Sequence, residues 1–142
     1  MTVSANDVLL SVTGLEGGYD QVQVLWGVDL EVSAGEMVAI IGSNGAGKTT
    51  FLKTISGIVR SRAGSMVFDG NALESATAKE IVELGISHVP EGRQIFKDLS
   101  VDENLWMGSY GSGGKHGGGV KRIYEYFPAL ADRRRQRAET LS

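Results

Sequence analysis

The sequence contains no cysteine, which excludes both a disulfide framework and a thiolate metal site. No apolar run approaches the ~20 residues that a membrane-spanning helix needs. Residues 1–7 have neither the basic region nor the apolar region of a secretory signal. We therefore expect a soluble protein of the cell interior, which would reach a membrane only through a partner.

An excess of positive charge is missing too, because 14 Lys and Arg stand against 17 Asp and Glu and the net charge is −3. No global basic field attracts the chain to nucleic acid, which is not an expected partner. The basic run at 133–137 has no aromatic platform beside it, so we interpret it as a solvated helix face. Glycine, in contrast, is abundant at 20 of 142 residues, and much of it clusters in two places.

The apolar pattern predicts mostly strands first, and then alternating strands and helices. We expect strands at 8–12, 28–32, 37–41, 64–70 and 86–89. We expect helices at 48–56, 77–85, 101–107, 121–127 and 130–138. Residues 37–41 are continuously apolar, as in a strand buried on both faces, while the glycine-rich 111–119 predicts a flexible link. We also expect a single α/β domain that carries an antiparallel β flank, with Trp26 in its core rather than at the rim of a binding pocket.

Two residue pairs have the spacing of a helix-capping box, Thr77 with Glu80 and Ser100 with Glu103. This spacing favours Glu103 as a capping residue rather than a general base. His88 lies in an expected strand, so we interpret it as a packed or edge histidine rather than a catalytic one.

A phosphate-binding loop is the strongest motif, because residues 42–49 match G-x-x-x-x-G-K-[ST] at every fixed position. Its glycines allow positive φ and close approach to an anion, so that successive amides can form a nest for phosphate oxygens. The helix that follows adds its positive N-terminal end. Lys48 would reach the β- and γ-phosphates, and the Thr49 hydroxyl would bind Mg²⁺. The predicted nucleotide-binding residues of this segment are Gly42, Ser43, Asn44, Gly45, Ala46, Gly47, Lys48, Thr49 and Thr50.

The spelling of this loop, GSNGAGKTT, resembles the G-x-N-G-A-G-K-T-T form of ABC transporter ATPases. Upstream, Gly18 and Tyr19 resemble the A-loop of that family, in which an aromatic ring stacks on adenine. Residues 68–70 are similar to the strand and turn after the family's first helix, and 99–105 to the opening of its helical subdomain.

This resemblance implies an incomplete P-loop NTPase fold, with a nucleotide-binding core at 1–100 that contains the phosphate loop at 42–49. Residues 101–142 would be part of a helical subdomain. ATP and Mg²⁺ would be the ligands, and Tyr19 would be the adenine platform.

The segment VPEGRQIF at 89–96 resembles the ATPases of branched-chain amino acid importers and their relatives for urea and short amides. It lies where the family has its Q-loop, whose Gln contacts Mg²⁺ or the attacking water. Here Glu91 occupies that position, and a carboxylate can bind the cation but cannot donate a hydrogen bond when ionised. Gln94 is an alternative, so the resemblance leaves the Q-loop role open between these two residues, with Thr49 and Glu91 as the metal ligands.

The final residues, Leu141 and Ser142, resemble the first two of the family's L-S-G-G-Q signature. The catalytic Glu and the switch His of the family would follow later. We therefore expect these 142 residues alone to hydrolyse ATP poorly or not at all, and to expose an unpaired sheet edge.

The resemblance implies an ATP-hydrolysing subunit that pairs with a second ATPase subunit and drives a transmembrane permease. It would lie at the cytoplasmic face of the membrane, with an external solute-binding protein as an indirect partner. Two alternatives stay open: a nucleotide-binding module without turnover, and a P-loop ATPase outside transport, such as a DNA-repair or translation-factor ATPase.

Overall fold

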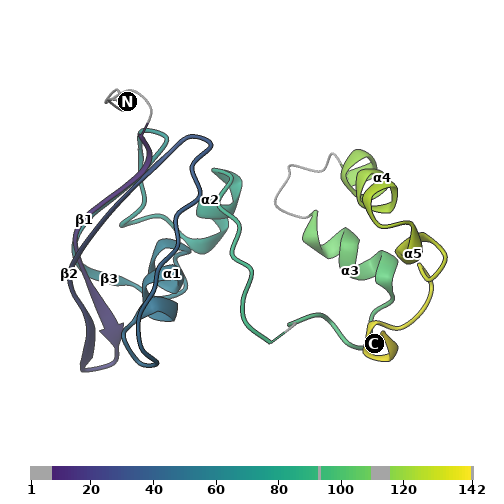
Figure 1. Ribbon diagram of the computed structural model, residues 1–142, viewed down its shortest axis with the longest axis horizontal. Coiled ribbons are helices and arrows are strands. Elements are labelled where there is room, and N and C mark those ends of the chain that lie inside the picture. The colour runs from purple at the N-terminus through teal and green to yellow at the C-terminus, as the bar shows by residue number, and fades with distance from the viewer. Residues whose placement is uncertain (1–7, 93, 110–115, 142) are drawn as a thin grey trace. The chain divides into compact units, whose positions relative to one another are not determined.

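The computed structural model describes residues 8–92, 94–109 and 116–141 (Figure 1). The chain divides into two compact units, Met1–His88 and Val89–Ser142. The predicted division into domains at residue 100 concerns the whole protein and stays a prediction. Among the described residues, no helix combines the length and the apolar character needed to cross a bilayer.

The first unit is built on an antiparallel sheet of four strands in the order β2-β1-β3-β4. These strands are β1 (Val8–Tyr19), β2 (Val22–Ser33), β3 (Ser61–Phe68) and β4 (Asn71–Ala72). Two helices, α1 (Lys48–Ile55) and α2 (Ala78–Glu83), complete the unit, and α1 contacts both β1 and β2 (Figure 1). The mixed α/β architecture and the antiparallel sheet are therefore as predicted.

A single apolar core joins this sheet to both helices. Strands supply Val12, Leu15, Leu25 and Met66, helix α1 supplies Phe51 and Ile55, and Leu73 and Ile81 complete the cluster. Trp26, in contrast, is 73% exposed, so its expected place in the core was wrong. The reason is the alternation of side chains along a strand, since its neighbour Leu25 is the residue that faces the core.

Two expected strands do not form. Residues 37–41 and 86–89 have no regular secondary structure, and within the described part of the chain neither segment pairs with a strand. The prediction that 37–41 is buried on both faces was wrong, because Met37 is 97% exposed and Ile41 is 93% exposed. Val89 is likewise 92% exposed. A strand needs a partner for its backbone groups, and apolar character alone does not provide one.

The second unit is helical, with α3 (Val101–Gly108), α4 (His116–Tyr126), α5 (Pro128–Ala131) and a short 3₁₀ helix, η2 (Ala138–Thr140). Because α4 begins at His116, the part of the expected glycine link that lies at 116–119 is helical, and 111–115 lies outside the described residues. The expected helix at 130–138 was wrong, since α5 ends at Ala131.

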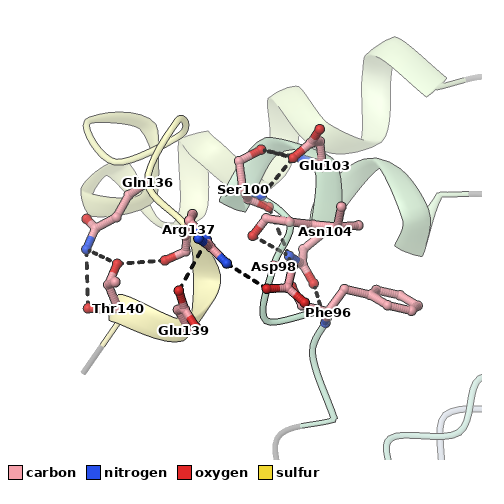
Figure 2. A network of polar contacts seen from close by, with 10 residues as sticks. Phe96, Asp98, Ser100, Glu103, Asn104, Gln136, Arg137, Glu139 and Thr140 are labelled. Atoms are coloured by element: carbon pink, nitrogen blue, oxygen red, sulfur yellow. Dashed lines mark hydrogen bonds and ion pairs between the residues drawn. The ribbon is translucent and has the colours of Figure 1, made fainter.

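Tertiary hydrogen bonds explain why that helix stops. The amides of Val101 and Asp102 donate to the carbonyls of Gln136 and Arg134, and Ser100 forms an isolated bridge with Arg137. Carbonyls used in this way hold residues 134–137 along the start of α3 in a non-helical conformation. Figure 2 shows the side chains that reinforce this arrangement. The Nη2 atom of Arg137 is 2.6 Å from Asp98 Oδ1, and its Nε atom is 3.2 Å from Glu139 Oε1.

Candidate nucleotide site

The predicted phosphate loop connects the exposed segment at 37–41 to helix α1 and contains two glycines in the left-handed conformation. Gly45 and Gly47 have φ values of 86° and 95°, which L side chains rarely adopt. Gly47 is also the N-cap of α1, and no side chain caps the helix. The amides of the first turn of α1 are thus available to an anion at the positive end of the helix dipole.

Lys48, the first residue of α1, folds back over its own loop. Its Nζ atom donates hydrogen bonds to the carbonyl oxygens of Gly42 at 2.7 Å and Ser43 at 2.8 Å. The ammonium charge is therefore held against the loop, where negatively charged phosphate oxygens would be stronger acceptors than carbonyl groups.

The loop is supported by strand β2. A Cβ atom placed on Gly47 would meet side-chain atoms of Leu25 and Val24 at 3.2 Å. This close approach explains a glycine at that position in addition to its positive φ, and it fixes the start of α1 against the sheet.

Tyr19, the predicted adenine platform, lies beside the same helix. It is the last residue of β1 and is 43% exposed. Thr50 donates a hydrogen bond from its Oγ1 atom to the Tyr19 hydroxyl at 3.5 Å, and the Nζ atom of Lys53 is 6.0 Å from the ring centroid. The structure thus brings Tyr19 together with the helix that follows the phosphate loop.

The backbone directly before Tyr19 requires glycine, because strands β1 and β2 come very close at Gly18. A Cβ atom on Gly18 would lie 2.0 Å from the carbonyl oxygen of Val22, which is shorter than any real contact. Thr50 is buried, and its hydroxyl is used in the contact with Tyr19. A role for Thr50 toward phosphate therefore stays a prediction.

The predicted metal ligands belong to different units, so their shared role at one metal ion stays a prediction. Thr49 is exposed next to Lys48 in the first unit, whereas Glu91 and Gln94 are exposed residues of the second unit. No group of three or more His, Cys, Asp or Glu residues in the described ranges is suited to hold a metal ion. One hydroxyl beside a phosphate loop nevertheless fits Mg²⁺, which takes one or two protein ligands together with phosphate oxygens and water.

The polar residues weighed as alternative catalytic groups have structural partners. Glu103 forms a complete capping box with Ser100, which confirms the sequence interpretation, and these bonds lower the pKa of the Glu103 carboxyl. The Nδ1 atom of His88 is 3.0 Å from Ser56 Oγ. Because Ser56 donates its hydroxyl proton to the Leu52 carbonyl at 2.6 Å, His88 Nδ1–H is the donor in this pair.

Sequence inspection missed two basic residues near Tyr19. Lys53 lies over its ring, and Arg62 on β3 donates from Nη2 to the carbonyl oxygens of Asp20 at 2.6 Å and Val22 at 3.4 Å. Arg62 is 40 or more positions from both partners, so no local pattern could have identified it.

Comparison with known proteins places this chain in a family. A family model described as ABC transporter matches residues 25–142. The high-affinity branched-chain amino acid transport ATP-binding protein BraG of Pseudomonas aeruginosa is 38% identical over 135 residues, which cover 94% of this chain and 58% of BraG. The galactose/methyl galactoside import ATP-binding protein MglA of Clostridium tetani is 36% identical over 123 residues, which cover 84% of this chain and 24% of MglA.

A solved ATP-binding subunit of an ABC transporter has the same fold, with a TM-score of 0.81 and 30% sequence identity. The match covers 94% of this chain and 56% of that structure. The chain therefore belongs to the ABC transporter family, and it spans rather more than half the length of BraG.

Proposed function

We propose that this chain is the nucleotide-binding part of an ATPase subunit that energises an ABC importer. The observation that carries the proposal is the geometry of the phosphate loop, with two left-handed glycines, an uncapped helix start and the Lys48 ammonium held against the loop. Such a site is chemically complementary to the triphosphate of a nucleotide.

Each residue of the loop has a distinct task in this proposal. The amides at the start of α1 bind phosphate oxygens, and Lys48 exchanges its two carbonyl acceptors for the β- and γ-phosphates. Thr49 holds Mg²⁺ through its hydroxyl, and Glu91 or Gln94 contributes to the same ion or to the attacking water. Tyr19 stacks on the adenine ring, because its exposed side chain lies beside α1.

The transported substrate is a finer proposal. Similarity to BraG over 94% of this chain supports branched-chain amino acids. MglA is also similar, and the name of that protein refers to galactose, so the family is broader than one class of cargo. The Pro-Glu-Gly-Arg spelling at 90–93 favours the amino acid class, with urea or short amides as the alternative.

The whole protein would work with partners. We propose a second ATPase subunit, a permease that holds the protein at the cytoplasmic face of a membrane, and an external solute-binding protein. A groove of about 450 Å³ in the second unit supports the permease contact, since Ile95, Phe96, Leu105 and Met107 line it. Apolar side chains exposed together in this way are typical of protein interaction surfaces.

Calorimetric titration of the chain with Mg·ATP tests the nucleotide proposal, using Lys48→Ala against Lys79→Ala. Lys79 is an exposed lysine of the same unit, in a surface ion pair with Glu83 at 3.7 Å, so its replacement should leave binding unchanged. Lys48→Ala removes charge-assisted hydrogen bonds to phosphate and should weaken binding by about tenfold or more. Equal affinity of Lys48→Ala and the unaltered chain would refute the proposal.

Phosphate release measured in the same samples separates binding from turnover. We expect Mg·ATP binding without release from these 142 residues, as a nucleotide-binding module without turnover would also show. Release at a rate that Lys48→Ala abolishes would instead show that this chain is catalytic by itself.

A further inference from the structure

The turn between β1 and β2 is attached to β3 by one side chain. Arg62 donates to the carbonyl oxygen of Asp20 at 2.6 Å and more weakly to that of Val22 at 3.4 Å. The Asp20 carbonyl belongs to the turn that directly follows Tyr19, and Val22 is the register partner of Tyr19 at the start of β2. Arg62 thus fixes the backbone that directly follows Tyr19 in the chain.

This turn contains a residue in the left-handed conformation, since Asp20 has a φ of 47°. Asp tolerates this conformation better than most residues with a side chain, and contacts to its backbone stabilise it further. A charged donor bonded to the carbonyl of the same residue is such a contact. The left-handed Asp20 is therefore the residue directly after Tyr19, and Arg62 of β3 bonds to its carbonyl.

The ring of Tyr19 has contacts from α1 as well. Its hydroxyl accepts from Thr50, and Lys53 lies over one face at 6.0 Å from the centroid. With the hydroxyl end fixed by α1 and the backbone fixed through Arg62, the ring is held from both ends while remaining 43% exposed. A stacking platform needs this combination of a fixed orientation and an open face.

We propose that Arg62 is a positioning residue for base recognition, acting through Tyr19 on the nucleotide and not on its phosphates. This inference rests on the proposed function, since it takes Tyr19 as the platform for the base. Arg62 would then determine how strongly the chain distinguishes ATP from a triphosphate that has no base.

The test compares Mg·ATP with magnesium tripolyphosphate as ligands of the chain and of Arg62→Gln. Arg62→Gln should weaken ATP binding by roughly five- to tenfold, a part of the effect of losing base stacking. Tripolyphosphate affinity should not change, because the phosphate loop is untouched, and this also shows that the variant is folded.

Arg60→Gln is the matched control. Arg60 is an exposed arginine two positions away whose guanidinium makes no hydrogen bond or ion pair within the described ranges. It should bind both ligands as the unaltered chain does. If Arg62 acts through Tyr19, the double variant Tyr19→Ala/Arg62→Gln should bind ATP no more weakly than Tyr19→Ala alone.

Three outcomes would overturn the inference: unchanged ATP binding by Arg62→Gln, an equal loss for both ligands, or additive losses in the double variant. An equal loss would mean that Arg62 only stabilises the sheet. Failure of the unaltered chain to bind either ligand is a different result, because it refutes the proposed function before Arg62 is considered.

Discussion

Single residues in the nucleotide site already have polar partners. Lys48 bonds to the carbonyls of Gly42 and Ser43, and Thr50 bonds to Tyr19. Binding of a triphosphate therefore exchanges one set of acceptors for another around Lys48, and the net gain is smaller than the gross strength of the new bonds. In the proposed function, phosphate oxygens would replace these carbonyls because they are the stronger acceptors.

Tyr124 gives a pH-dependent prediction in the second unit. Its hydroxyl donates to Asp102, which also pairs with Arg134 at 3.3 Å. Burial and then this carboxylate raise the pKa of Tyr124 from 10.0 to about 12. A raised pKa means that the folded state favours the neutral hydroxyl of Tyr124. The contribution of this hydroxyl to stability is therefore complete below pH 10.0 and is lost as the pH rises through about 12.

Urea unfolding of the chain and of Tyr124→Phe from neutral pH to above pH 12 measures this contribution. Tyr124→Phe should be less stable by about 0.5–1.5 kcal/mol at neutral pH, the typical value of one hydrogen bond. The difference between the two proteins should disappear at the alkaline end. Parallel curves over the whole range would contradict the assignment.

At the scale of elements, local signals were reliable and pairing was not. Both capping boxes form as predicted, since Thr77 and Ser100 bond to amides only three residues away. The phosphate loop is equally local, and two of its three glycines, Gly45 and Gly47, have a positive φ. The strands expected at 37–41 and 86–89 were wrong because strand formation depends on partners elsewhere in the chain.

The same distinction explains the other misses. The helix expected at 130–138 stops early because carbonyls of its expected second half accept hydrogen bonds from amides at the start of α3. Those amides lie 30 or more residues earlier in the chain. Arg62, which bonds to the turn after Tyr19, comes from a different strand. The local motif of the phosphate loop could be read from the sequence, but the contacts of Lys53 and Arg62 around Tyr19 could not.

Two methionines test the structure of these elements directly. Met37, in the expected strand that does not form, is 97% exposed, whereas Met66 of β3 is 2% exposed in the core. Met66→Ala should reduce the free energy of unfolding by about 2–5 kcal/mol, and Met37→Ala should change it by less than ~0.5 kcal/mol. Chemical denaturation measures both, and equal losses would show that residues 37–41 are packed.

The whole chain combines a loop that fits a nucleotide with exposed apolar segments. It spans 58% of BraG, and its segment at 37–41 leads directly into the phosphate loop. Met37 and Ile41 have no covering residues within the described part of the chain. The loop keeps its conformation nonetheless, because Gly47 packs on β2 and α1 packs on the sheet core.

The central claim is that backbone amides from 42 to 50, together with Lys48, enclose the triphosphate. Amide chemical shifts of the 142-residue chain during titration with Mg·ATP test it most directly. The account predicts the largest changes at Gly45, Gly47, Lys48 and Thr49, and their loss in Lys48→Ala. Shifts confined to other parts of the chain, or an unaltered response in Lys48→Ala, would contradict it.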